Sequence, residues 1–394
     1  MVSWDSHNMP ELQYLRFCLG IDKECPIIDD CEWPQVYDFC VKQSVLGIGF
    51  VGCEMVSANN RPSKELMLNW YAQARQIEGR NQLMNDRGIE LQTMFAEAGF
   101  EMCILKGQGN ALMYSSKLRI ENGKLKNSPQ SDNLALLRQP GDIDIWVRTR
   151  GDGRGTKGDI RRIIEFLGTK CDIQKQVIGY HHVEFPIFND VEVEVHWRPS
   201  WKSSPLYNQR MQKWFKEQAD AQFNHVDERS GMHVPTWEFN VIYLLQHMYL
   251  HIFQEGLGLR QVMDYYYLLH SAEDKLINEN GKLRSTLKYL GLWKFAGAAM
   301  YVMQEVFALD EKFMIAPVDK RRGTFLLEEI MRSGNFGRYD ERNRELSQKK
   351  GISRSLARLK RQYRYLRDYP VEVLCAPFQI YHVIWRKCQI WRWE

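Results

Sequence analysis

Two short segments with alternating side chains constrain the fold of this chain more than any other feature. Residues 141–147 read Gly-Asp-Ile-Asp-Ile-Trp-Val, and residues 191–197 read Val-Glu-Val-Glu-Val-His-Trp. Successive side chains of a strand point to opposite faces, so Asp142 and Asp144 share one face, about 6.5 to 7 Å apart along the chain. By the same parity, one face of the second segment carries Glu192, Glu194 and His196. Both segments therefore predict strands with one acidic and one apolar face.

Further apolar runs predict the neighbours of these strands. Residues 102–105 form a short apolar run, which the turn Lys106-Gly-Gln-Gly109 stops before helical spacing resumes. The runs 177–188 and 191–197 flank Asn189-Asp190, which is typical of a hairpin. Turn-forming residues predict loops over 121–136 and 151–158, and Asp159 is expected to cap a helix over 160–167.

Helical spacing dominates the rest of the chain. Residues 10–100 predict mostly helices, with one long helix or two over 66–98. Later helices are expected over the ranges 239–253, 257–270, 282–307 and, after a Lys/Arg-rich connector, 378–393. The predicted fold class is α+β, a small mixed sheet between helical regions. We divide it into an N-terminal region (1–85), a core (86–200) and a C-terminal domain with a basic tail (201–394).

The composition excludes several classes of protein. Of 394 residues, 44% are hydrophobic and 26% are charged, which is typical of a globular chain and not of a disordered one. No run approaches the roughly 18 apolar residues of a membrane span, and no signal-peptide core begins the chain. The nine cysteines lack the paired spacing of zinc sites and imply no disulfide framework. We expect a cytoplasmic protein.

The net charge of +4 is small for this length and argues against a dedicated nucleic-acid coat protein. The charge is unevenly distributed along the chain, because the segment from Arg354 to the C-terminus contains nine Lys or Arg and only three Asp or Glu. A solvated helix face explains this stretch, and contact with phosphate or an acidic partner is the alternative.

Adjacent carboxylates on an otherwise apolar strand repel each other unless a cation lies between them. Hard oxygen ligands favour Mg²⁺ or Mn²⁺. If the two strands are neighbours, a third acid joins Asp142 and Asp144, and the set can hold two divalent ions about 3.5 to 4 Å apart. The competing interpretation is that the acids form the solvated face of an antiparallel sheet.

A glycine turn upstream favours the metal interpretation. Lys106-Gly107 opens a helix, where free backbone N–H groups attract anionic phosphate and glycine permits close approach. The turn, the aspartate pair and the later acid together point to a metal-bound triphosphate as substrate.

These residues resemble a known family. Leu105-Lys-Gly107, Arg138 before Gly141-Asp-Ile-Asp144, and then Glu194-Val-His-Trp197 are similar to an uncharacterised bacterial nucleotidyltransferase family of the DNA polymerase beta-like superfamily. The resemblance is strongest over 66–264. It implies a palm-type core whose site is built by a glycine turn, an aspartate pair and a third acid. That acid is usually Asp in the family and is Glu194 here, while Glu192 competes with it by parity.

The resemblance also implies an activity, namely transfer of a nucleoside monophosphate from an NTP, such as ATP, to an acceptor hydroxyl. Asp142, Asp144 and Glu194 would be the catalytic metal ligands, with Mg²⁺ or Mn²⁺ as cofactor. Phosphate would contact the backbone of Gly107 and Gln108 and the side chains of Lys106 and Arg138. The acceptor is a small molecule, a sugar or a protein hydroxyl.

Five further residues carry more than one interpretation. His196 either contacts substrate or the third acid, or is a satisfied histidine at a sheet edge. His247 and His251 share a helix face, where they bind a metal, line the acceptor cleft, or hydrogen-bond in the core to a neighbour such as Asp264. Arg260 either pairs with Asp264 on its helix or binds an anionic group.

Two other functions compete with the transferase interpretation. The first is a binding protein that keeps the palm shape without turnover, although retention of both aspartates argues against it. The second is a nucleic-acid tailing enzyme, which the near-neutral overall charge disfavours.

Overall fold

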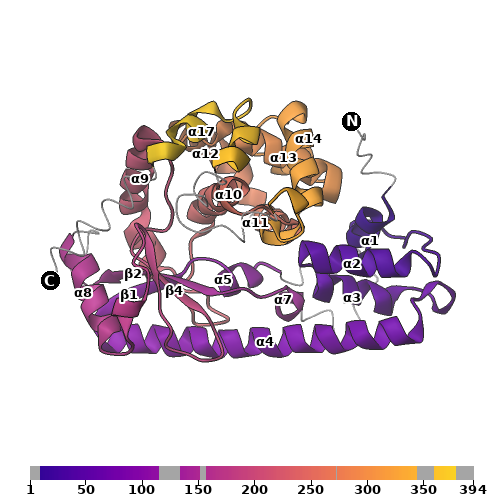
Figure 1. Cartoon of the computed structure of the whole chain (residues 1–394), viewed down its shortest axis with the longest axis horizontal. Coiled ribbons are helices and arrows are strands. Elements are labelled where there is room, and N and C mark those ends of the chain that lie inside the picture. Colours follow the sequence, from indigo (N-terminus) through magenta and orange to yellow (C-terminus); the bar gives the residue numbers. More distant parts are fainter. Residues whose placement is uncertain (1–8, 115–133, 151–156, 272, 344–358, 379–394) are drawn as a thin grey trace.

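The computed structural model describes residues 9–114, 134–150, 157–271, 273–343 and 359–378. One long helix, α4 (Lys64–Glu97), runs along the edge of the molecule (Figure 1). Its first turn is capped by the Ser63 hydroxyl, which accepts a hydrogen bond from Leu66 N at 3.3 Å. The predicted helical run over 66–98 is therefore one helix.

Three helices pack on the N-terminal half of α4: α1 (Pro10–Cys18), α2 (Trp33–Gln43) and α3 (Leu46–Met55), followed by the turn η2 (Ala58–Asn60). Trp70 of α4 is fully buried there, and its indole N–H donates to Leu46 O at 2.8 Å.

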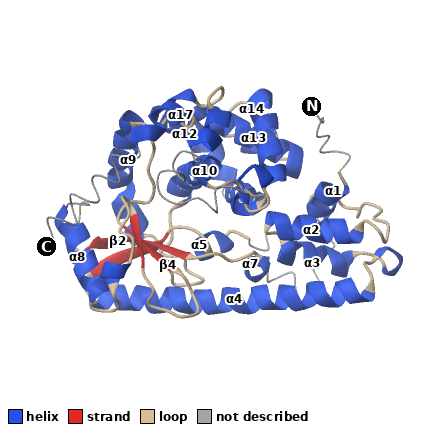
Figure 2. Cartoon of the chain, viewed as in Figure 1, coloured by secondary structure: helices blue, strands red, loops and turns tan. Residues whose placement is uncertain are grey.

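A four-stranded mixed sheet lies at the other end of α4 (Figure 2). Its strands are β1 (Phe100–Ile104), β2 (Ile143–Thr149), β3 (His182–Glu184) and β4 (Val193–His196), in the order β1-β2-β4-β3. The central pair β2 and β4 is parallel, and both outer pairs are antiparallel. The predicted fold class is confirmed.

The two faces of the sheet are covered differently, as the alternation predicts. The apolar face, including Ile145 and Val195, packs on α4 and on α8 (Lys157–Gly168) in a core of its own. On the acidic face, the Trp146 ring lies 4.8 Å from Phe223 and 5.8 Å from Phe239. These rings belong to α9 (Pro205–Asn224) and α10 (Trp237–Gln254), so C-terminal helices cover the acidic face.

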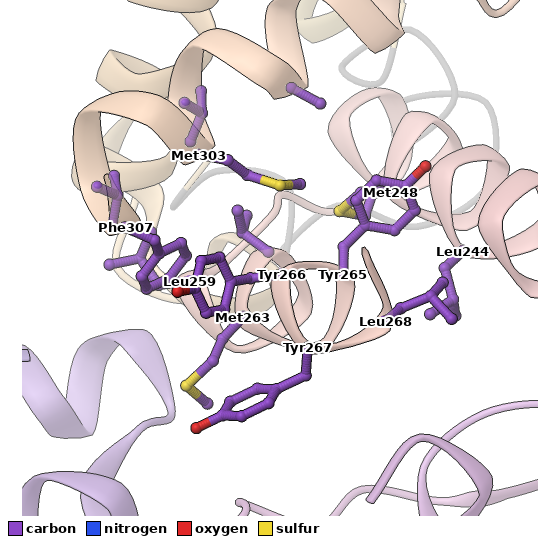
Figure 3. Close-up of a cluster of buried hydrophobic side chains, with 14 of the residues drawn as sticks. Leu244, Met248, Leu259, Met263, Tyr265, Tyr266, Tyr267, Leu268, Met303 and Phe307 are labelled. Atoms are coloured by element: carbon purple, nitrogen blue, oxygen red, sulfur yellow. The ribbon is translucent and has the colours of Figure 1, made fainter. Parts of the chain in front are cut away.

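The C-terminal helices form a layered bundle above α4. After α10 come α11 (Leu259–His270), α12 (Glu273–Tyr289), α13 (Trp293–Phe307), α14 (Lys320–Ser333) and α17 (Pro370–Cys375). Figure 3 shows how side chains of α11 pack between Met248 of α10 and Met303 and Phe307 of α13. The remaining elements are short: α5 (Gln108–Ala111), α7 (Leu134–Leu137), η4 (Ile173–Lys175), η5 (Glu311–Phe313), η6 (Asn335–Gly337), η7 (Glu341–Asn343), η8 (Tyr363–Tyr365) and η9 (Ala376–Phe378).

Several predicted boundaries were wrong. The expected helix over 282–307 is interrupted at Gly291, whose φ of +69° ends α12 before α13 begins. Residues 134–136 belong to α7 instead of a loop, and the Lys/Arg-rich connector contains α14. Asp159 does not cap α8 but lies in its first turn, where the Thr149 hydroxyl donates to it.

The hairpin is present but shorter than predicted. His182, Val183 and Glu184 pair with β4, and Pro186, which has no N–H to donate, follows after one further residue. The predicted terminal helix over 378–393 lies outside the described residues except for Phe378. Within the described part of the chain, no helix combines the length and apolarity needed to cross a membrane.

Candidate active site

The three predicted acids meet on one face of the sheet. Asp144 of β2 lies directly opposite Glu194 of β4 in the parallel register, and Asp142 precedes β2 by one residue. The Asp144 side chain is fully buried, whereas 30% of Asp142 and 28% of Glu194 is exposed. The three acids therefore extend from the interior to solvent. Glu192, the competing candidate, is exposed, and it forms no ion pair with any described residue.

Lys106 balances these carboxylates. Its Nζ lies 3.1 Å from Asp144 Oδ1 and 3.9 Å from Asp142 Oδ2. Burial alone would lower the pKa of Lys106, but the charges of Asp142 and Asp144 outweigh it and raise that pKa above its usual range. The residue is thus an ammonium ion held between the two aspartates.

His196 joins the same cluster from β4. Its Nε2 lies 3.0 Å from Asp144 Oδ1 and 3.2 Å from Glu194 Oε2. Burial opposes ionisation, yet hydrogen bonds to the two carboxylates raise the pKa of His196 to about 9. Burial likewise opposes ionisation of Glu194, whose pKa falls to about 2 because His196, His182 and Lys106 surround it. His196 therefore contacts the third acid and lies on an interior strand, not at a sheet edge.

Two histidines at this site were missed by the sequence analysis. His182 of β3 pairs with His196, and its Nε2 lies 3.9 Å from Glu194 Oε1. His181 Nε2 lies 2.8 Å from His182 Nδ1. Burial and the neighbouring imidazoles lower the pKa of both rings. A two-residue turn at Asn189-Asp190 would place Val183 opposite His196, whereas the structure pairs His182 with it, so the hairpin signal alone does not identify His182.

The donor set fits a divalent cation. One ligand atom each from Asp144, Glu194 and His196 lies within 4.8 Å of the other two. Asp144 Oδ2 is buried without a hydrogen-bond partner among the described residues. A buried, unpartnered carboxylate oxygen beside other acids is costly without a cation and is a natural oxygen ligand for Mg²⁺ or Mn²⁺.

The glycine turn borders the acids as predicted. Gly107 has φ +67°, and a Cβ there would lie 3.3 Å from the Asp142 carbonyl oxygen. Leu105 N donates to Asp144 O at 2.9 Å, which fixes the turn to β2. Among the described residues, the N–H groups of Gly107 and Gln108 have no acceptor. The side chain of Gln108 points away, toward Asn85 of α4 at 2.9 Å.

A cavity of about 30 Å³ continues from the turn toward the C-terminal helices. Its size suits about two water molecules. Its lining combines core and helical residues, among them Lys106, Gly107, Arg138, Asp142, His247, Arg260 and Asp264. The structure thus brings most of the predicted site residues to one cavity.

Arg138 and Asp264 form a bidentate ion pair in this wall. Arg138 Nε and Nη2 each lie 2.7 Å from a carboxylate oxygen of Asp264. The Tyr114 hydroxyl also donates to Asp264 at 2.6 Å. The expected pairing of Arg260 with Asp264 is therefore wrong, because Asp264 points toward Arg138.

Arg260 instead lines the cavity beside the loop before β2. Its Nη1 donates to the carbonyl oxygens of Gln139 and Pro140 at 3.2 and 3.0 Å. Burial and the nearby Arg138 charge lower the pKa of Arg260 to about 10. Arg260 forms no ion pair with a carboxylate of the described residues, and its Nε has no acceptor among them.

His247 and His251 contact each other on α10. Their Nε2 atoms lie 2.8 Å apart, and His251 Nδ1 lies 3.4 Å from Glu255 Oε2. Burial lowers the pKa of His247, which favours its neutral form. The predicted hydrogen bond to Asp264 is wrong, since that carboxylate is taken by Arg138 and Tyr114.

Of the comparisons with known proteins, one finds a match. No curated protein and no solved structure matches the chain. A family model does match, and the matched region contains Arg138, Asp142, Asp144 and Glu194 but begins after Lys106 and Gly107. The predicted resemblance is thereby confirmed: residues 134–308, a little less than half of the chain, match the family described as an uncharacterised nucleotidyltransferase.

Proposed function

We propose that this chain transfers a nucleoside monophosphate from an NTP to an acceptor hydroxyl and releases pyrophosphate. The observation that carries the proposal is the placement of Asp142, Asp144 and Glu194 on one sheet face beside the Gly107 turn. The family match supports nucleotidyl transfer in general, and the acids and the turn support the finer assignment.

The three carboxylates favour a divalent metal ion as cofactor. Asp142, Asp144 and Glu194 would hold Mg²⁺ or Mn²⁺, which when bound neutralises phosphate charge as a Lewis acid. In the structure, the ammonium group of Lys106 places a positive charge between the carboxylates of Asp142 and Asp144. With a metal ion held by these acids, the Lys106 ammonium group would be free to contact the phosphates.

The protein groups then have distinct tasks. Glu194 orients the acceptor hydroxyl or accepts its proton as the oxygen attacks the α-phosphorus. The bond between the α-phosphorus and the bridging oxygen breaks, and the leaving pyrophosphate accepts hydrogen bonds from Gly107 N and Gln108 N. Lys106 and Arg260 add positive charge on the same side. Arg138 holds Asp264 in the cavity wall, and His247 faces the same space.

The acceptor is a small molecule, a sugar or a protein hydroxyl. The net charge of +4 over the whole chain supports these classes over a nucleic acid.

The first test measures nucleotide binding. The melting temperature would be followed with each ribonucleoside triphosphate, with and without Mg²⁺, in the wild type and in an Asp142→Asn, Asp144→Asn double variant. A ligand at 100 times its Kd stabilises the folded state by about 2.7 kcal/mol. We expect Mg²⁺-dependent stabilisation in the wild type and in the matched control Glu192→Gln, and none in the double variant.

Pyrophosphate release in the presence of candidate acceptors then tests the chemistry. Loss of the aspartates should lower the rate by at least about 10³-fold, the scale on which charge-stabilising groups act in phosphoryl transfer. If the double variant binds and turns over NTP as the wild type does, the acids are not the catalytic centre and the proposal fails.

A further inference from the structure

Three imidazoles converge at one side of the acidic cluster. One ring nitrogen each from His181, His182 and His196 lies within 4.8 Å of the other two. They come from the start of β3 and from β4, and the antiparallel pairing of His182 with His196 holds two of the rings together. Three histidines gathered this closely are a recognisable donor set for a metal ion.

Glu194 completes this set with oxygen. Its Oε1 lies 3.9 Å from His182 Nε2, and its Oε2 lies 3.2 Å from His196 Nε2. A hydrogen bond between His181 and His182 explains the 2.8 Å contact between those rings. His196 is only 4% exposed, and its Nδ1 is buried without a hydrogen-bond partner among the described residues.

The chemistry of this set differs from that of the three acids. Imidazole nitrogens with one carboxylate suit zinc and related transition metals, whereas Mg²⁺ prefers oxygen ligands throughout. We propose that His181, His182, His196 and Glu194 bind a divalent transition-metal ion of the zinc class. Zinc lies about 2.0 to 2.2 Å from such ligands, which places neighbouring donor atoms about 3.3 Å apart. In the structure the Glu194 and His196 donor atoms lie 3.2 Å apart, and the three imidazole nitrogens lie within 4.8 Å of one another.

The site is reachable from solvent, and it shares Glu194 with the proposed magnesium ligands while adding three imidazoles that those ligands lack. The His182 side chain is 27% exposed, so an ion can enter beside β3. Asp142 and Asp144 remain as oxygen ligands on the neighbouring strand. The inference needs no nucleotide transfer, so it stands or fails independently of the proposed function.

Metal binding is the direct test. Full-length protein without a histidine tag would be stripped with a chelator and titrated calorimetrically with Zn²⁺. We expect one ion per chain, and at least about 100-fold weaker binding in a His181→Ala, His182→Ala double variant, since even outer-shell changes weaken metal affinity 10- to 100-fold. His225→Ala is the matched control, because His225 is exposed and contacts Val234 O away from the cluster.

A spectroscopic measurement on the wild type does not depend on the folding of a variant. Co²⁺ bound by imidazoles in a four-coordinate site absorbs visible light strongly, whereas six-coordinate Co²⁺ bound by oxygen is pale. Intense bands that Zn²⁺ abolishes would support the site. Pale spectra, no Zn²⁺ binding, or equal Zn²⁺ affinity in the double variant would each overturn it.

If the zinc-class site fails these tests but Mg²⁺-dependent nucleotide binding is present, the proposed function remains intact. Zinc binding without any response to nucleotides would contradict the proposed function and leave the zinc-class site standing.

Discussion

At the scale of single residues, the sequence predicted the identity of the acids better than their surroundings. Alternation placed Asp142, Asp144 and Glu194 on one face because the strand period of two is a strict geometric rule. The partners of these acids come from other elements. Lys106 lies between two of them, and His182 lies across a hairpin whose register a single sequence leaves open.

The Arg138–Asp264 pair illustrates the same limit. The two residues are 126 positions apart, and nothing in the local pattern of either indicates the other. Both side chains are at least 95% buried. Removing one partner of such a pair leaves the other charge buried and unpaired, which costs about 3 to 5 kcal/mol.

Arg138→Ala should therefore lower the free energy of unfolding by about 3 to 5 kcal/mol in chemical denaturation. The matched control is Arg161→Ala, which removes an exposed pair with Glu165 and should cost no more than about 0.5 kcal/mol. If Arg138→Ala keeps wild-type stability but loses NTP affinity, the residue is a phosphate ligand and not part of the scaffold.

At the scale of elements, long periodic helices were predicted well and their ends poorly. Ser63 caps the helix just before the run over 66–98, and the run has no internal proline, so local signals define α4. The break at Gly291 could not be distinguished from a tolerated helix glycine, because that depends on the Tyr207 ring, which would lie 2.8 Å from an added Cβ. Tertiary packing decides such positions.

Gly79 and Gly47 allow a measurement of how tertiary packing changes the effect of an alanine substitution in a helix. Gly79 lies on an exposed side of α4 with no atom within 4 Å of an added Cβ. Gly79→Ala should raise the free energy of unfolding by about 0.5 to 1 kcal/mol, because alanine loses less backbone entropy in a helix. Gly47 of α3 instead packs on the Leu137 carbonyl, where an added Cβ would clash.

Gly47→Ala should accordingly lower the free energy of unfolding by about 1 to 3 kcal/mol, as other overpacked sites do. Thermal melting of both variants beside the wild type gives the comparison. Shifts of the same sign would show that helix propensity, not contact between α3 and α7, governs these positions.

At the scale of the whole molecule, the structure has two hydrophobic cores, one on each face of the sheet. One core joins the N-terminal helices, the acidic face of the sheet and the C-terminal helices, while the apolar face has a second core. The predicted boundary after residue 85 falls inside α4, which packs on both the N-terminal helices and the sheet. Composition and turn-forming residues indicate linkers between domains. A helix that packs on two parts of the molecule has neither feature, so the sequence does not show that the two parts are joined.

Lys202 reports on the docking of the sheet against the C-terminal helices. It follows β4, is 1% exposed, and its Nζ lies 4.1 Å from the ring centre of Tyr249 on α10. The next residue, Ser203, donates its N–H to Glu372 of α17 at 2.7 Å. Burial lowers the pKa of Lys202 to about 8, against the opposing attraction of Glu372.

This burial predicts a pH-dependent stability. Below about pH 8, Lys202 is charged in both the folded and the unfolded chain, and the folded state bears the full cost of burying the charge. Between about pH 8 and the ordinary lysine pKa of about 10.4, the folded chain loses this proton while the unfolded chain keeps it, so stability rises with pH. From pH 7 to pH 10, the free energy of unfolding of the wild type should rise by about 2 to 3 kcal/mol relative to that of Lys202→Met.

Urea denaturation of both proteins at several pH values measures this difference, in which titrations common to both proteins cancel. Lys213→Met is the control, because Lys213 is 69% exposed and its variant should differ from the wild type by the same amount at every pH. A Lys202→Met difference that is equally flat would mean that water reaches the Lys202 amine. The sheet and the C-terminal helices would then be less closely docked around residue 202 than its burial indicates.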